Sequence, residues 1–203
     1  MGYLLVIVGA YLLGCSNMAL YLSKLKKQDL RGNGTGNLGA SNATIIMGWR
    51  AGVAVGAHDI AKSAVAVILA ELLFPDLPAV GAVAGVASVM GHIFPFYMKF
   101  KGGKGFASFI GMSVVLNWKI TLVVLALMLV ITVITDYMVA GTMTTIILVP
   151  VGIGVLTQSI LIPLIILLAT AVITYKHREN FVRMHNGTEI GLKSTIKGEN
   201  RKT

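Results

Sequence analysis

Long apolar runs alternate with short polar stretches along the 203 residues of the chain. A helix that crosses the hydrocarbon core of a bilayer needs about 20 mostly apolar residues. Six runs approach that length, at residues 3–22, 53–74, 80–96, 120–135, 138–156 and 160–175. A seventh and shorter run, at residues 106–118, predicts a tilted or re-entrant helix.

The composition supports a membrane protein. Hydrophobic residues make up 56% of the chain and charged residues 12%, and the mean hydropathy is +0.82. A water-soluble domain with a solvated surface could hardly sustain that balance. We therefore expect an all-α integral membrane protein, built as a compact bundle of about seven transmembrane helices.

The formal net charge of +9 is explained by membrane topology, because cytoplasmic loops carry an excess of Lys and Arg. An extracellular N-terminus places residues 24–50, 99–104 and 176–203 inside the cell. These segments hold every Lys and Arg except Lys62 and Lys119. The C-terminus is then cytoplasmic, and no nucleic-acid partner is expected.

One transmembrane domain is expected over residues 1–189, because there is no internal repeat of the kind found in many secondary transporters. Residues 190–203 mix Lys, Gly, Glu and Asn, and predict a polar cytoplasmic tail that is poorly ordered. Three cytoplasmic stretches are rich in Gly, Asn, Lys, Arg or His, and the chemistry is expected there.

The first of these stretches reads RGNGTGNLGASN over residues 31–42. It matches the GxGxxG dinucleotide fingerprint, but that fingerprint functions between a strand and a helix, and here an apolar span precedes it. Glycines let backbone N–H groups converge on an anion, and Ser41 or Asn42 is expected to cap a short helix whose N-terminus favours negative charge. Phosphate binding and a flexible Gly/Asn loop explain this stretch equally well.

The second stretch reads GHIFPFYMKFKGGKG over residues 91–105. It is not a P-loop, because Met98 stands where the first Gly belongs and Gly105 where Ser or Thr belongs. Two lysines around two glycines still offer flexible backbone donors beside point charges, which suits a phosphate. A positive-inside signal would explain the lysines, but not Gly102, Gly103 and Gly105 together.

The third stretch reads KHRENFVRMHNGTE over residues 176–189, and is expected to continue the last span as an interfacial helix. His177, Asn180 and Met184 would then share one face. A basic amphipathic end that lies against anionic headgroups is the simpler explanation, and these residues alone favour it.

One apolar run contains His58, Asp59 and Lys62. Ionisable residues inside a span usually face the bundle interior and pair with one another, so Asp59 and Lys62 predict an ion pair with a functional role. The alternative is that these side chains lie near the cytoplasmic end of the span and extend to the interface.

Taken in this order, the three stretches resemble the bacterial membrane glycerol-3-phosphate acyltransferases that use acyl phosphate as donor. The first motif of that family is similar to residues 34–42, the second to residues 91–105 and the third to residues 176–189. Asp59 and Lys62 correspond to a family Asp-x-x-Lys. The resemblance covers residues 1–189.

Several positions depart from the family pattern. Thr35 stands for the usual Ser and Ser41 for the usual Thr, so each hydroxyl is kept. Ile45 replaces a common arginine, and Arg50 is expected to take over that charge. Thr142 keeps a hydroxyl where the family has Ser.

The resemblance implies transfer of a fatty acyl group from a long-chain acyl phosphate to the 1-hydroxyl of glycerol 3-phosphate. The products are lysophosphatidate and inorganic phosphate, in the first step of phospholipid synthesis. The resemblance also implies a multi-pass protein of the bacterial inner membrane, in contact with membrane lipid and with its site at the cytoplasmic face. Neither a cofactor nor a metal is expected.

The resemblance also implies the site residues. The expected catalytic residues are Lys104, His177 and Asn37. The expected substrate-binding residues are Thr35, Gly36, Gly39, Asn42, Arg50, Lys62, Gly102, Gly103, Thr142 and Asn180.

The donor is expected to be an acyl phosphate rather than a coenzyme A thioester. No histidine has an Asp five positions later, so the His-x4-Asp motif of the other acyltransferase group is missing. An acyl phosphate is already activated, so positioning and charge stabilisation could carry much of the rate. The working hypothesis is that the donor phosphate itself takes the hydroxyl proton.

Two other classes share some of these features. A small membrane transporter for a phosphate-bearing solute would have similar spans and basic loops, but it should place its site near mid-membrane on broken helices. A non-catalytic scaffold for anionic lipid explains the charge but not the clustered glycines.

Overall fold

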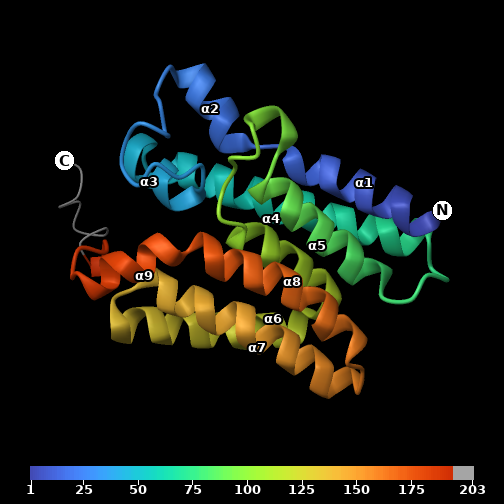
Figure 1. The fold of residues 1–203 in the computed structure, drawn as a ribbon. Coiled ribbons are helices and arrows are strands. Elements are labelled where there is room, and N and C mark those ends of the chain that lie inside the picture. The colour runs from blue at the N-terminus through green and yellow to red at the C-terminus, as the bar shows by residue number, and fades with distance from the viewer. Residues whose placement is uncertain (194–203) are drawn as a thin grey trace. The chain divides into compact units, whose positions relative to one another are not determined.

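The computed structural model describes residues 1–193, and all of their secondary structure is helical (Figure 1). They form two compact units, Met1–Leu116 and the part from Asn117 onward, which are described one at a time. Residues 194–203, most of the predicted tail, lie outside the described part of the chain. The elements are α1 (Gly2–Cys15), α2 (Met18–Lys26), α3 (Ala40–Met47), α4 (Trp49–Leu73), α5 (Val80–Ile93), the 3₁₀-helix η1 (Phe96–Met98), α6 (Phe106–Thr135), α7 (Met138–Thr157), α8 (Leu161–Lys176) and α9 (Arg178–His185).

Five helical stretches of the described residues are long and apolar enough to cross a membrane. The number rises to six if α8 and α9, which meet at an angle of 45°, are counted as one span. The five are Gly2–Lys26, Trp49–Leu73, Val80–Met98, Phe106–Thr135 and Met138–Thr157. The prediction of an all-α, multi-pass membrane protein is therefore confirmed, while this count does not reach the predicted seven spans.

The difference in number arises partly at Asn117 in α6. Its φ of −162° and ψ of 93° are extended values that interrupt the helix. The Asn117 side chain accepts a hydrogen bond of 3.1 Å from the backbone N–H of Ile120, as an N-cap residue does. The break thus lies at the end of the first of the two runs that the sequence separates, 106–118 and 120–135, although the two form one 30-residue element.

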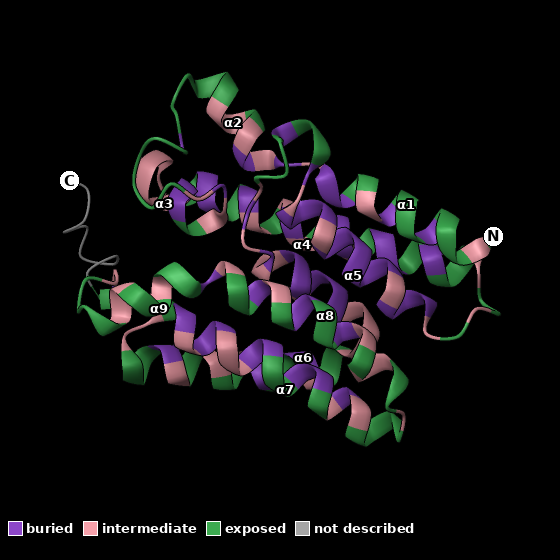
Figure 2. Cartoon of the chain, viewed as in Figure 1, coloured by how far each residue is buried: buried purple, intermediate pink, exposed green. Residues whose placement is uncertain are grey.

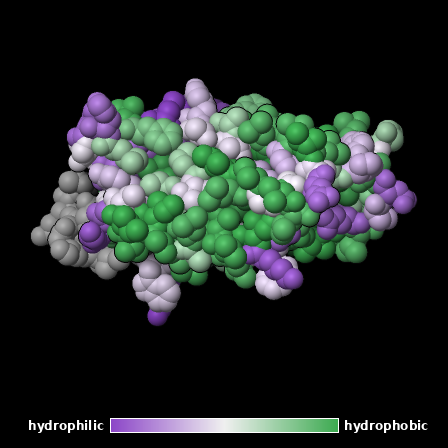
Figure 3. All heavy atoms as spheres, turned by 90° about the horizontal axis from the view of Figure 1, so that it is seen from below, coloured by the Kyte–Doolittle hydropathy of each residue, from purple (hydrophilic) through white to green (hydrophobic). Residues whose placement is uncertain are grey.

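Apolar side chains cover most of the surface visible in Figure 3. Many large hydrophobic residues are exposed along the helices, among them Leu4 and Leu5 of α1, Val123 of α6 and Val155 of α7. A soluble protein rarely exposes so much apolar surface, whereas a surface in contact with lipid requires it.

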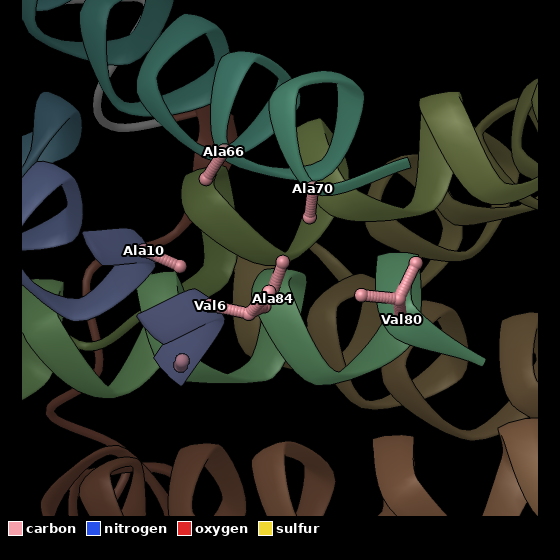
Figure 4. Close-up of a cluster of buried hydrophobic side chains, with 7 residues drawn as sticks. Val6, Ala10, Ala66, Ala70, Val80 and Ala84 are labelled. Carbon is pink, nitrogen blue, oxygen red and sulfur yellow. The ribbon is translucent and has the colours of Figure 1, made fainter. Parts of the chain in front are cut away.

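Small side chains form the core of the first unit. There α1 packs against α4 and α5, and α4 packs against α5. Alanines and valines from the three helices point toward one another (Figure 4), and α5 is buried along most of its length (Figure 2). In lipid, helix association depends on close packing, which small residues permit. The residues of this cluster are Val6, Ala10, Ala66, Ala70, Val80, Ala84 and Ala87.

Two glycines bring α1 and α5 into backbone contact. A Cβ atom on Gly14 would overlap the Ser88 carbonyl group, and one on Gly91 would overlap the Tyr11 carbonyl group. Neither overlap can be relieved by moving a flexible side chain, because the neighbouring atoms belong to backbone.

We expect Gly91→Val to lower the free energy of unfolding by about 1–3 kcal/mol, the usual range for overpacking a well-packed contact. The measurement is unfolding of the purified protein in mixed detergent micelles. Gly9→Val is the matched control. It makes the same change in α1 at a position where an added Cβ atom would meet no packed neighbour within 4 Å. Equal stability of the two variants would contradict the close α1–α5 contact.

The second unit contains α7 packed against α8. The hydroxyl of Thr170 in α8 donates a hydrogen bond of 2.9 Å to the Ile146 carbonyl in α7. Buried isoleucines lie along both helices, at Ile146 and Ile153 in α7 and at Ile166 and Ile173 in α8.

The first residues of the predicted tail attach to the turn between α6 and α7. The N–H of Leu192 donates to the Asp136 carbonyl at 2.8 Å, and the N–H of Lys193 donates to Asp136 Oδ1 at 2.9 Å. Residues 192–193 are therefore held by backbone hydrogen bonds, and the prediction of a poorly ordered tail falls mostly on residues outside the described part of the chain.

Candidate active site

The first glycine-rich stretch folds around the side chain of Asn42. Its buried Oδ1 accepts a hydrogen bond of 2.8 Å from the N–H of Thr35, and its Nδ2 donates to the carbonyls of Leu30 (2.7 Å) and Asn33 (3.3 Å). Gly34 has φ of 62° and Gly36 φ of 68°, a left-handed conformation that favours glycine. The loop therefore has a specified shape, with the Asn42 amide bonded within it.

The expected helix after this loop is α3, but its cap differs from the prediction. The helix begins at Ala40, and the N-cap residue is Gly39, without a side-chain hydrogen bond. Ser41 and Asn42 therefore lie inside the first turn and do not cap it. Thr35 and Gly36 are exposed, and Asn37 is half-buried.

The second stretch folds back onto the end of α5. Gly102 N–H donates to the Ile93 carbonyl at 3.0 Å, and Gly103 N–H donates to the His92 carbonyl at 3.2 Å. These donors were expected to be flexible and to serve a phosphate, but they bond within the protein. Close packing is what requires glycine, because a Cβ atom on Gly102 would overlap the His92 carbonyl and one on Gly103 would overlap the His92 ring.

The two stretches contact one another in the first unit. Arg31 donates from its guanidinium to the Lys101 carbonyl at 2.6 Å. A Cβ atom on Gly103 would lie 3.1 Å from the Leu38 carbonyl oxygen, so Gly103 packs against Leu38. The expected catalytic residues Asn37 and Lys104 are the chain neighbours of Leu38 and Gly103.

Lys104 lies just before the N-terminus of α6, which begins at Phe106. Its side chain is half-buried, between the buried residues Gly103 and Gly105. The N-terminal end of a helix carries partial positive charge and unsatisfied N–H groups, which favour an anion. A lysine beside such an end is well placed for a phosphate.

A buried polar cluster joins α4 to α5 and to the break between α1 and α2. Lys62 Nζ lies 2.8 Å from Asp59 Oδ1, 2.6 Å from the Ser16 carbonyl oxygen and 2.9 Å from His92 Nδ1. The predicted ion pair is confirmed, and both partners are buried rather than extended to an interface. Lys62 Nζ therefore lies among groups of the protein itself, while its expected substrate contact stays a prediction.

His92 is the member of this cluster that sequence reasoning missed. Its Nδ1 also lies 3.3 Å from Asp59 Oδ1. The contact joins residues about 30 positions apart, and no local spacing predicts it. The sequence offered one indication of a role for His92, its position near the start of the second stretch.

The third stretch, in the second unit, is held together by Glu189. Its carboxylate accepts hydrogen bonds from Asn180 Nδ2 at 2.5 Å and from Arg183 Nε at 2.7 Å. The stretch continues the last span as α9, as expected, but the chain bends by 45° where α8 gives way to α9, at His177. Glu189 and Arg183 were not among the expected site residues, although both lie in the third motif.

His177 is buried, and its Nδ1 lies 2.8 Å from the Ile173 carbonyl oxygen. A carbonyl oxygen only accepts hydrogen bonds, so Nδ1 carries the proton. In the neutral ring, Nε2 is then the basic nitrogen. This tautomer suits a residue that accepts a hydrogen bond or a proton from a hydroxyl group.

The remaining expected residues lie on helices. Thr142 is buried in α7 and donates to the Met138 carbonyl one turn earlier at 3.0 Å, which leaves its oxygen as an acceptor. Arg50 is exposed at the start of α4, with its guanidinium 5.6 Å from the centre of the Trp49 ring.

Comparison with known proteins identifies many relatives. The family model described as glycerol-3-phosphate acyltransferase matches residues 4–187. The glycerol-3-phosphate acyltransferase of Thermoanaerobacter pseudethanolicus is 34% identical over 191 residues, which cover 93% of this chain and 96% of the relative. The enzyme of that name from Coxiella burnetii is 35% identical over 196 residues, which cover 95% of this chain and 100% of the relative.

Two solved structures have the same fold. Both are of the integral membrane glycerol 3-phosphate acyltransferase PlsY (YgiH), and both are 30% identical to this chain. The match to the glycerol 3-phosphate form has a TM-score of 0.90 and covers 97% of this chain and 98% of the chain in that structure. The lysophosphatidic acid form has a TM-score of 0.87 and covers 98% of both chains.

Proposed function

Because this chain belongs to the glycerol-3-phosphate acyltransferase family, we propose that it moves a fatty acyl group from a long-chain acyl phosphate to the 1-hydroxyl of glycerol 3-phosphate. The products are lysophosphatidate and inorganic phosphate. The observation that carries the proposal is the pair of interlocked glycine loops that present Lys104 before the N-terminus of α6. Both the acceptor and the donor bring a phosphate that such a site would hold.

The proposed chemistry needs little from the protein beyond placement and charge. The 1-hydroxyl oxygen attacks the acyl carbon, the bond from that carbon to the phosphate oxygen breaks, and phosphate leaves with the hydroxyl proton. Lys104 stabilises the negative charge on the leaving phosphate, and Asn37 donates a hydrogen bond beside it. His177 orients the acceptor hydroxyl through Nε2, because its Nδ1 proton is held by Ile173.

The proposed topology has seven spans, with α6 counted as two segments on either side of Asn117. The N-terminus is outside, the C-terminus is cytoplasmic, and the site faces the cytoplasm at the bacterial inner membrane. The support is the distribution of Lys and Arg, of which only Lys62 and Lys119 lie outside the three proposed inner segments.

The donor is tested by giving the purified protein glycerol 3-phosphate with either palmitoyl phosphate or palmitoyl-coenzyme A. We expect lysophosphatidate from palmitoyl phosphate alone, because the proposed mechanism needs a donor that is already activated. Product is measured by mass spectrometry, with inorganic phosphate as the second product. Lysophosphatidate from the thioester alone, or from neither donor in a folded sample, would rule out the proposed reaction.

A transporter remains the second class to test, because the first span is broken between α1 and α2. The exposed backbone at such a break binds ions in many transporters. Here the Cys15 carbonyl accepts from the Tyr97 hydroxyl at 2.7 Å, and the Ser16 carbonyl accepts from Lys62 at 2.6 Å. These carbonyls are therefore used within the protein, which favours the enzyme.

A further inference from the structure

His92 lies between the buried ion pair Asp59–Lys62 and the loop of residues 99–104. On one side of the ring, Nδ1 is 2.9 Å from Lys62 Nζ. An ammonium group only donates hydrogen bonds, so Nδ1 accepts from Lys62, and Asp59 Oδ1 lies 3.3 Å from the same nitrogen. On the other side, the ring faces Gly103, because a Cβ atom on Gly103 would overlap both Nε2 and Cε1.

The position of the ring is determined by three helices. Lys62 belongs to α4 and is held by Asp59 of the same helix at 2.8 Å and by the Ser16 carbonyl, just after α1, at 2.6 Å. His92 belongs to α5, which packs against both. These close contacts limit the movement of Lys62 and, through it, of the His92 ring.

The loop rests on His92 through both its ring and its backbone. The Gly103 N–H donates to the His92 carbonyl at 3.2 Å, and the Gly103 backbone lies directly against the ring. Lys104 is the next residue. A shift of the ring therefore moves Gly103, and with it the backbone that carries Lys104.

We propose that His92 is a positioning residue for acyl transfer: Asp59 and Lys62 hold its ring, the ring supports Gly103, and Gly103 places Lys104. This inference rests on the proposed function, in which Lys104 acts on a substrate phosphate. His92 itself touches no substrate in this account. Its expected effect follows from the sensitivity of catalysis to placement, since a 1 Å displacement costs about 10²-fold in rate.

The main experiment is a double-mutant cycle on kcat/KM with His92→Ala and Lys104→Met. We expect His92→Ala to lower kcat/KM by about 10- to 100-fold. In the Lys104→Met background the same change should have almost no further effect, because the group that His92 places is gone. If the double variant instead showed the product of the two single fold losses in kcat/KM, His92 and Lys104 would act independently and the proposal would be overturned.

The matched control is Ser88→Ala. Ser88 lies one turn before His92 on α5, and its hydroxyl is 2.8 Å from that of Ser63 on α4. The control thus removes a buried contact between the same two helices without touching the loop, and kcat/KM should stay within about twofold of the wild type. A loss equal to that of His92→Ala would reduce His92 to a packing residue and overturn the proposal.

Hydrogen exchange of the 94–105 backbone supplies a readout that is independent of activity. Exchange should be faster in His92→Ala than in the wild type or Ser88→Ala, and unchanged exchange would overturn the proposal.

His92→Asn keeps an acceptor near the place of Nδ1, so it should be more active than His92→Ala. It also serves as the folded variant if the alanine form does not fold. If the wild type makes no lysophosphatidate, the proposed function fails, and exchange alone decides the role of His92.

Discussion

Replacing Lys104 with methionine is expected to lower kcat/KM by about 10²–10³-fold, the usual loss when one group that stabilises transition-state charge is removed. Methionine keeps most of the apolar stem and removes the charge that would hold a phosphate. Initial rates at varied palmitoyl phosphate and glycerol 3-phosphate would show the loss and which substrate it affects.

Lys101→Met is the matched control for this change. Lys101 lies in the same loop, but its side chain is exposed, and its contact to Arg31 uses the backbone carbonyl. The control should stay within about threefold of wild-type activity, because surface substitutions away from a site have small effects. If the two variants lost activity equally, the loop would act through its total charge and Lys104 would have no specific role.

Replacing Lys62 with methionine is expected to lower the free energy of unfolding by about 3–5 kcal/mol, because it leaves the buried Asp59 carboxylate without its partner. The Ser16 carbonyl loses its donor in the same step. Unfolding in mixed detergent micelles measures the change. The double variant Asp59→Asn with Lys62→Met should recover much of the loss, since a neutral pair leaves no unpaired buried charge.

Lys119→Met controls for loss of a lysine outside the basic loops. Lys119 is exposed, with Nζ 5.7 Å from the centre of the Trp118 ring, so little change in stability is expected.

The Lys62→Met variant also separates a structural role of Lys62 from a role in binding substrate. If Lys62 bound substrate, as the family resemblance implies, Lys62→Met would raise the KM for glycerol 3-phosphate and leave stability unchanged.

Local pattern was enough to predict the helical membrane class and several details. The interruption near Asn117 and the Asp59–Lys62 pair were predicted because each depends on residues close in sequence. The close α1–α5 contact through Gly14 and Gly91 was not, because small residues indicate that helices pack tightly without specifying which helices meet.

The shapes of the candidate-site loops were less predictable than the helices. Gly102 and Gly103 were expected to offer free donors, but they donate to carbonyls at the end of α5 and pack against it. The Asn42 amide lies at the centre of its own loop, while its substrate contact stays a prediction. Both arrangements depend on contacts between segments apart in the chain, which one sequence does not reveal.

The break after α1 has a consequence for biosynthesis. A carbonyl without a partner costs several kcal/mol inside a bilayer, and the partners of Cys15 and Ser16 are Tyr97 and Lys62. Because the ribosome makes the chain from its N-terminus, these partners are synthesised 82 and 46 residues later. The first span must therefore wait in another form, or beside the insertion machinery, until α4 and η1 have emerged, so this span is made first but reaches its final structure only after α5 and η1 have been synthesised.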